Sequence, residues 1–298
     1  MSHSPNGLTD VFTVSAAPGV TFWIAVPDTD DPNVQMIRNG KYPPSLQGLF
    51  TALTTTLSAP ARVLDLGGYL GGFGLAAAAA GYEVAIVEAN PRNAEWIRRS
   101  LALNRFAYPV QVIETAVGEV ERWVEFHAEG PYGHVQQEHS EANIRVKQIT
   151  LPALMQTIGW EAPSFVKMDV EGSEGGVLRG ARSWFALGHR PTFLYEANGH
   201  TLHWFGDSQV KLRTMLASLG YHQYEVEPDG SIRVPTRLEP RVVVDYLASA
   251  QPLSALPHRS AWKVLRRTAA ALRRRSRPSR MHVLRMVVGV MKGHFGPR

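Results

Sequence analysis

An acidic, glycine-rich segment and a glutamate that follows it along the chain could together bind a ligand that contains a nucleoside. The segment reads Asp65-Leu66-Gly67-Gly68-Tyr69-Leu70-Gly71 and joins an apolar run to an alanine-rich one. Glycines in such a turn let the backbone approach a ligand, and the start of the following helix points N–H groups at it. Glu88 ends the next apolar run, where a carboxylate can accept hydrogen bonds from two ribose hydroxyls.

The composition of this loop favours a cationic ligand over a pyrophosphate. A dinucleotide-binding turn reads G-x-G-x-x-G, whereas this loop reads G-G-Y-L-G behind the acidic Asp65. A carboxylate there repels a pyrophosphate and attracts the sulfonium and amino groups of S-adenosylmethionine. We therefore expect S-adenosylmethionine as the cofactor, with an NAD-type dinucleotide-binding enzyme as the alternative.

Three polar residues follow the fourth and fifth predicted strands of the core, where the methyl group of the cofactor should project. Asp169 ends the run Ser164–Met168, and Glu196 and Asn198 follow Phe193–Tyr195. Two carboxylates and an amide supply the oxygen ligands that Mg²⁺ accepts. One hypothesis is therefore a magnesium site formed by Asp169, Glu196 and Asn198.

A hydroxyl acceptor needs a general base or a metal, because a protonated hydroxyl is a poor nucleophile. Asp169 is the first candidate for this base. Lys167 precedes it by two residues and shares its strand face, either as a base or as an ion-pair partner. His200 and His203 lie in a predicted loop and could accept a proton near neutral pH, although ordinary surface histidines would look the same.

The residues after Asp169 argue against methylation of a nucleic-acid base. That chemistry commonly uses an Asp/Asn-Pro-Pro-aromatic segment, and this chain has Asp169-Val170-Glu171-Gly172 instead. An acidic cluster would also repel phosphates, so nucleic acid is not an expected partner. We interpret Glu171 and Glu174 as structural residues at a helix start, where the helix dipole stabilises a carboxylate.

Strand-like and helix-like segments alternate through the middle of the chain. The predicted strands are Val63–Leu66, Glu83–Val87, Val110–Ile113, Ser164–Met168, Phe193–Tyr195 and Tyr221–Val226, with Trp123–Phe126 and Ile144–Ile149 as an inserted pair. The predicted helices are Gly71–Ala80, Pro91–Asn104, Thr150–Ile158, Glu174–Leu178 and Val210–Leu219. This alternation predicts an α/β fold with a doubly wound, mainly parallel seven-stranded sheet, a final antiparallel strand and helices on both faces.

Four segments organise the 298 residues. We expect an N-terminal β extension over 1–46, a cofactor-binding domain over 47–226, an extension packed on the core over 227–257 and a basic tail over 258–298. The chain has no cysteine, which excludes thiol catalysis and disulfides. No secretory signal or long apolar run is present, so we expect a cytoplasmic protein.

Charge is strongly segregated along the chain. Twelve Lys and Arg and no acidic residue follow Asp245, which leaves 19 basic against 26 acidic residues before that point. Apolar residues recur at helical spacing in the tail, at Trp262, Leu265, Ala269 and Leu272 and again at Met281, Leu284, Val288 and Met291. Basic amphipathic helices bind anionic membranes, so we expect peripheral attachment to the inner face of the membrane.

Five segments of the chain resemble the successive motifs of FkbM-family methyltransferases. They are Asp65–Gly71, Glu88–Pro91, Ala116–Gly118, Lys167–Glu174 and Leu178–Ala181, within a resemblance over residues 47–226. The most specific of them is the pattern K-x-D-V-E-G-x-E, and one departure is Tyr69, where the family often has Asn.

The resemblance implies an S-adenosylmethionine-dependent enzyme that methylates a hydroxyl of a sugar, glycolipid, polysaccharide or natural product, with a lipid-linked acceptor fitting the basic tail. It also implies the cofactor contacts: Asp65, Gly67 and Gly71 at the methionine end, Glu88 at the ribose, and Ala116 and Val117 beside the adenine. A binding or scaffold protein that keeps the fold without the activity is the non-enzymatic alternative.

Overall fold

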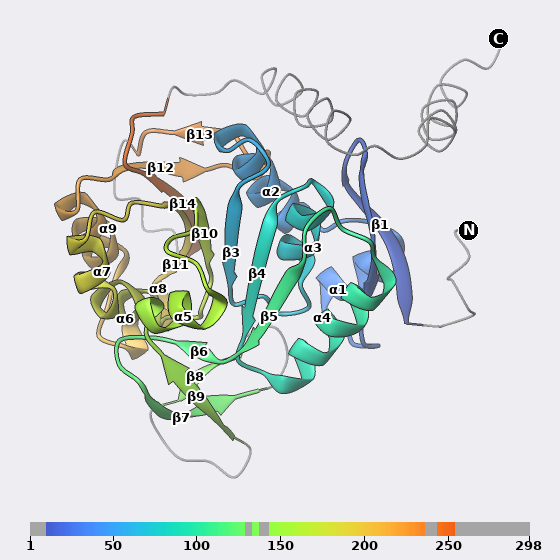
Figure 1. The fold of residues 1–298 in the computed structure, drawn as a ribbon, viewed down its shortest axis with the longest axis horizontal. Helices are drawn as coiled ribbons and strands as arrows, with labels where there is room; N and C mark the ends of the chain where they lie inside the picture. The colour runs from blue at the N-terminus through green and yellow to red at the C-terminus, as the bar shows by residue number, and fades with distance from the viewer. Residues whose placement is uncertain (1–9, 129–132, 137–142, 236–242, 254–298) are drawn as a thin grey trace.

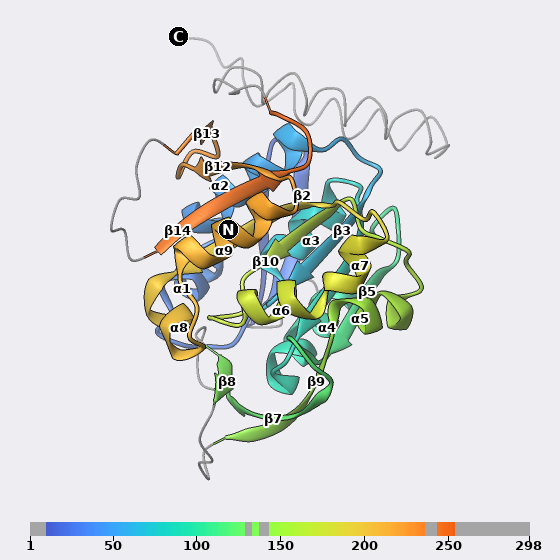
Figure 2. The same cartoon turned by 90° about the vertical axis from the view of Figure 1, so that its left-hand side faces the viewer.

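A central mixed β-sheet with helices on both faces forms the core of the chain (Figures 1 and 2). The computed structural model describes residues 10–128, 133–136, 143–235 and 243–253. The strand order of the sheet is β13-β12-β14-β11-β10-β3-β4-β5. The strands are β3 (Arg62–Leu66), β4 (Glu83–Glu88), β5 (Val110–Glu114), β10 (Phe165–Met168), β11 (Thr192–Asn198), β12 (His222–Val226), β13 (Ile232–Arg233) and β14 (Val243–Ser249).

The sheet has eight strands rather than the seven that the sequence predicts. The five neighbouring strands β11, β10, β3, β4 and β5 run parallel to one another. The three remaining pairings, among β11, β14, β12 and β13, are antiparallel. The eighth strand is β13, because the chain turns back at Gly230 and pairs its next residues with β12. β14 comes from the segment 227–257, which we expected to pack on the core, and it lies inside the sheet between β11 and β12.

Side chains alternate along the strands between two cores, one on each face of the sheet. Val63 and Ile86 point to the face covered by α1 (Pro32–Arg38), α2 (Pro44–Thr56), α3 (Gly72–Ala79) and α4 (Pro91–Leu103). Leu64 and Val87 point to the face covered by α5 (Leu151–Ile158), α6 (Glu174–Gly180), α7 (Arg182–Ala186), α8 (Gly199–Trp204) and α9 (Gln209–Ser218). The predicted doubly wound arrangement is therefore present.

Two smaller sheets flank the central one. The hairpin β1 (Val11–Ala17) and β2 (Val20–Ala25) lies against α4, where Ser100 accepts a hydrogen bond from the backbone N–H of Ala25 at 2.9 Å. The other sheet has the order β6-β9-β7-β8 and consists of β6 (Ala116–Val117), β7 (Arg122–His127), β8 (His134–Gln136) and β9 (Ile144–Ile149). Its antiparallel β7 and β9 are the inserted pair that the sequence predicts.

The predicted basic tail, residues 258–298, lies outside the described residues. In the part of the chain that the structure describes, no helix combines the length and the apolar surface needed to cross a membrane.

Candidate functional site

Two adjoining cavities lie where β3, β4 and β10 end. Gly67, Glu88, Gly133 and Asp169 line both, so the two form one continuous site. We call the first the apolar pocket, because most of its wall is formed by Leu66, Val87, Ala89, Ala116, Val117, Phe126, Val135 and Val170. We call the second the acidic cavity, after the carboxylates that line it: Asp31, Glu88, Asp169, Glu171, Glu196, Glu227 and Asp245.

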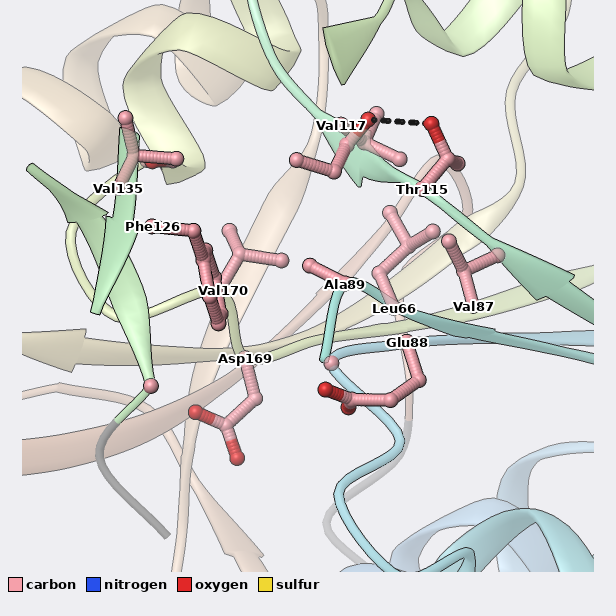
Figure 3. A pocket seen from close by; sticks show the side chains of 14 residues that line it. Leu66, Val87, Glu88, Ala89, Thr115, Val117, Phe126, Val135, Asp169 and Val170 are labelled. Atoms are coloured by element: carbon pink, nitrogen blue, oxygen red, sulfur yellow. Dashed lines mark hydrogen bonds between the residues drawn. The ribbon is translucent and has the colours of Figure 1, made fainter. Parts of the chain in front are cut away.

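The small inserted sheet borders the apolar pocket on one side. Phe126 of β7 and Val135 of β8 stand on that side, facing Val117 and Leu66 across the pocket (Figure 3). Branched aliphatic side chains with one aromatic ring make a flat, apolar slot of the kind that accepts a nucleobase. Ala116 and Val117, predicted beside an adenine, both line it.

The glycine-rich loop forms the boundary between the two cavities. Gly67 has a φ of +77°, and a Cβ atom there would lie 1.7 Å from the carbonyl oxygen of Asp169, so only glycine fits. The N–H groups of Gly67 and Gly68 both donate to the carbonyl of Val87 at 3.0 Å. Gly71, also predicted as a cofactor contact, instead caps α3 with a φ of +83° and is not among the lining residues.

Glu88 is buried at the junction of the two cavities. Its carboxylate accepts hydrogen bonds from the backbone N–H of Tyr69 at 2.7 Å and of Asn90 at 2.8 Å. Burial raises the pKa of Glu88 to about 7, against the effect of these two donors. The sequence predicts Glu88 at the end of a strand beside a ligand site, and the structure places its carboxylate at the end of β4, where it lines both cavities.

A polar row crosses one face of the sheet, because Asp65, Lys167 and Asp169 point to the same side of β3 and β10. The Lys167 ammonium lies 3.4 Å from Asp65 and 3.3 Å from Asp169, and donates to the carbonyl of Gly67 at 2.8 Å. Asp65 is fully buried and also accepts from the N–H of Gly74 at 3.0 Å. It therefore supports the loop from behind and does not line either cavity.

Lys167 is held as a cation. Burial alone would lower its pKa, but the carboxylates of Asp169 and Asp65 outweigh that effect and raise the pKa above its usual value. A lysine with a raised pKa keeps its proton near neutral pH and cannot accept another. Of its two predicted roles, the geometry supports the ion-pair partner.

Asp169, Glu171 and Glu196 converge in the acidic cavity. One carboxylate oxygen of each lies within 4.8 Å of the others. Burial raises the pKa of Glu171 to about 7 and that of Glu196 to about 9, and in both cases the charge of Asp169 raises it further. Asp245 of β14 pairs in register with Glu196, and burial raises its pKa to about 7.

Glu171 is the residue of this cluster that sequence reasoning missed. We interpreted it as a helix-capping residue, but the N-cap position of α6 is Ser173, and it is Glu174 whose carboxylate accepts hydrogen bonds from the N–H groups of Val170 and Gly172 in the turn before the helix. Glu171 instead has a left-handed φ of +49° and lines the acidic cavity. The signal in the sequence is the glycine at position 172, which marks a tight turn directly after the strand.

Three other predicted residues lie apart from this cluster. Asn198 caps α8, where its side-chain oxygen accepts a hydrogen bond from the N–H of His200 at 3.1 Å, and it does not line the acidic cavity. His200 and His203 are exposed on α8, outside the residues that line the two cavities. The structure thus brings together Asp169, Glu196 and Lys167, but not these three.

Comparison with known proteins identifies one matching family model, the methyltransferase FkbM domain, over residues 65–222. No curated protein matches the chain. Solved structures that resemble it include precorrin-6y C5,15-methyltransferase from Geobacter metallireducens GS-15, with 13% identity, 69% of this chain and 88% of that chain covered, and a TM-score of 0.37. Another is magnesium protoporphyrin IX methyltransferase from Synechocystis PCC 6803, with 11% identity, coverage of 76% and 90%, and a TM-score of 0.40.

A third similar structure is an S-adenosylmethionine-dependent methyltransferase from Agrobacterium tumefaciens, with 14% identity, coverage of 84% of this chain and 72% of that chain, and a TM-score of 0.43. The family model spans more than half of the chain and includes the glycine-rich loop, Glu88 and the acidic cluster at Asp169, Glu171 and Glu196.

Proposed function

The chain belongs to the FkbM methyltransferase family and is an S-adenosylmethionine-dependent methyltransferase, and from this premise we propose that it methylates a hydroxyl oxygen of a sugar, glycolipid, polysaccharide or natural product. The observation that carries the proposal is the continuity of the apolar pocket with the acidic cavity at Glu88 and Asp169. In this proposal the nucleoside of the cofactor lies in the apolar pocket and the acceptor lies in the acidic cavity.

The residues present fit S-adenosylmethionine. In this proposal Ala116, Val117 and Phe126 hold the adenine, Glu88 holds the ribose hydroxyls, and the backbone of Gly67 lies at the methionine end. When bound, the cofactor supplies an electrophilic methyl group on a sulfonium. The carboxylates around it favour that positive charge, because opposite charges attract most strongly where water is excluded.

The charge of the acidic cavity favours a neutral or cationic acceptor. Among the described residues that line it, seven are carboxylates and Lys167 is the one basic side chain, already paired with Asp65 and Asp169. An acceptor with a phosphate or carboxylate would be repelled at this wall. A sugar hydroxyl or an amino sugar meets no such barrier, which supports our choice of acceptor over nucleic acid.

We assign proton removal to the carboxylates rather than to Lys167 or His200. Lys167 keeps its proton, and His200 is exposed outside the cavity. Asp169 is oriented by Lys167 at 3.3 Å, and Glu171 is adjacent to it with a pKa of about 7. A group with a pKa near the working pH accepts a proton and releases it with comparable ease.

A divalent cation is the second element of this proposal. Asp169, Glu171 and Glu196 would hold Mg²⁺, with Glu171 taking the place that we first gave to Asn198, because hard oxygen ligands suit this ion. The ion would lower the pKa of the acceptor hydroxyl. Treatment with EDTA should reduce the rate of methyl transfer, and added Mg²⁺ should restore it. An unchanged rate after EDTA would show that methyl transfer does not require a metal.

Methyl transfer itself is tested by mass spectrometry. Incubation of the chain with isotope-labelled S-adenosylmethionine and a pool of neutral glycans, amino sugars and glycolipids should yield products heavier by one labelled methyl group. Binding of the cofactor without transfer to any acceptor would favour a binding or scaffold protein instead.

We further propose that residues 258–298 attach the chain to an anionic membrane surface, where a lipid-linked acceptor would be found. The proposal depends on sequence alone, since these residues carry positive charge without acidic residues. Deleting them should abolish flotation with anionic liposomes and leave methylation of a soluble acceptor intact. Failure of the full-length chain to bind liposomes at low salt would overturn it.

A further inference from the structure

Two residues other than glycine have a left-handed backbone in the described part of the chain, and both line the acidic cavity. They are Tyr69, with a φ of +50°, and Glu171, with a φ of +49°. A bulky residue is strained in this region, and such strain persists where the side chain is needed. Glu171 already belongs to the carboxylate cluster, whereas the role of Tyr69 has not been accounted for.

Tyr69 connects the cofactor loop to α1. Its backbone N–H donates to Glu88 at 2.7 Å, and its phenolic O–H donates to the Oδ2 atom of Asp31 at 3.1 Å. The other oxygen of Asp31 caps α1, where it accepts from the N–H groups of Asn33 at 2.7 Å and Val34 at 3.1 Å. Tyr69 therefore connects Glu88, which it contacts through its backbone, with the N-cap residue of α1, which it contacts through its side chain.

The helix that Tyr69 reaches forms a wall of the acidic cavity. Pro32, Asn33, Val34 and Ile37 of α1 line it, on the same side of the sheet as α3. The cofactor loop lines the same cavity through Gly67, Gly68 and Tyr69. The position of α1 relative to the loop therefore sets the width of the space left for an acceptor.

We propose that Tyr69 is a positioning residue that couples occupancy of the cofactor site to the placement of α1 along the acceptor space. The coupling is transmitted through the hydrogen bond between the Tyr69 hydroxyl and Asp31. It rests on the proposed function, because it requires S-adenosylmethionine or its product to contact the loop at Glu88. It also gives a physical reason for tyrosine at a position where glycine would avoid strain.

Hydrogen exchange with S-adenosylhomocysteine as the probe tests this coupling. In the wild type, saturating S-adenosylhomocysteine should slow exchange of the amides of residues 33–38 by at least about fivefold. Tyr69→Phe removes only the hydroxyl, and Asp31→Ser keeps a capping oxygen that is too short to reach Tyr69. Both variants should bind the probe with a dissociation constant within about threefold of the wild type and lose most of the protection, because the connecting hydrogen bond is gone.

Tyr42→Phe is the matched control. The Tyr42 hydroxyl donates to the carbonyl of Gly72 at 3.1 Å, so this variant also loses a buried tyrosine hydrogen bond, but at a residue that does not line the cavity. Protection of the amides of residues 33–38 should persist in this control variant. Two results would overturn this inference alone: protection in Tyr69→Phe and Asp31→Ser equal to that of the wild type, or binding of S-adenosylhomocysteine to the wild type without protection of α1. Absence of any binding to the wild type would overturn the proposed function together with it.

Discussion

The apolar pocket and the acidic cavity adjoin where strands of the central sheet end, but side chains from opposite faces of that sheet line them. Leu66 and Val87 point to one face of the sheet and line the apolar pocket, whereas Lys167 and Glu196 point to the other face and line the acidic cavity. Apolar walls bind by shape and buried area, and carboxylates bind by charge. We therefore expect binding in the apolar pocket to depend on the volume of the side chains that line it. Binding and proton transfer in the acidic cavity should depend on pH and on charge.

The largest expected effect is on turnover, from Asp169→Asn in the acidic cavity. The substitution keeps the shape and removes the charge that pairs with Lys167, so methyl transfer should fall by at least about 100-fold. Cofactor affinity, measured by calorimetry, should change by less than about threefold, since the apolar pocket is intact. Asp28→Asn, at an exposed residue outside both cavities, is the control and should keep full activity. Retained turnover in Asp169→Asn would move the base role to Glu171.

A substitution at the boundary should weaken cofactor binding. Glu88→Ala removes a carboxylate placed to accept charge-assisted hydrogen bonds from the ribose, and the expected loss is about 1.5–3 kcal/mol of binding free energy. The measurement is a dissociation constant for S-adenosylhomocysteine in a variant that remains folded by circular dichroism. An unchanged constant would remove Glu88 from the site.

A smaller loss of affinity is expected in the apolar pocket. Phe126→Ala removes an aromatic wall and should cost about 1–2 kcal/mol of cofactor binding, equally at pH 6 and pH 8. Trp123→Ala on the same strand is the matched control, because Trp123 is 60% exposed and lies on the opposite face of β7. Similar losses in the two variants would mean that the small sheet acts through general stability.

The smallest effect is a pH dependence of stability that comes from the acidic half. Burial raises the pKa of Glu174 to about 8 and of Glu196 to about 9, from an ordinary value of 4.5. These glutamates hold their protons in the folded chain at pH values where the unfolded chain releases them. Their contribution to the free energy of unfolding is therefore complete below pH 4.5 and is lost as pH rises through 9. The melting temperature should fall by about 5 °C between pH 5 and pH 9. Glu196→Gln should flatten this decline, and a rise in melting temperature would contradict it.

Most of the site could be predicted from the sequence because apolar runs show where the strands end. Gly67, Glu88 and Asp169 directly follow or end apolar runs, and the structure places each of them on both cavities, whereas Val117, which the family resemblance implied, lines the apolar pocket. Asp65 was assigned to the ligand from its place before the glycine-rich loop and from the family resemblance, but it lines neither cavity. Its burial depends on Lys167, a partner about 100 residues away that local pattern does not identify.

The remaining differences come from backbone geometry and long-range pairing. Glu171 enters the cavity because its φ is positive, and Asn198 leaves it because the chain begins α8 there. β14 pairs with strands far from it in sequence, so its place between β11 and β12 follows from tertiary structure and not from its short apolar run.

Calorimetric titration of the wild-type chain and of Val117→Trp with S-adenosylhomocysteine and, separately, with NAD tests the central claim most directly. Trp at position 117 would fill the apolar pocket that we assign to the adenine. We expect the wild type to bind S-adenosylhomocysteine but not NAD, and Val117→Trp to lose this binding while remaining folded. Binding of NAD without S-adenosylhomocysteine, or undiminished binding in Val117→Trp, would contradict it.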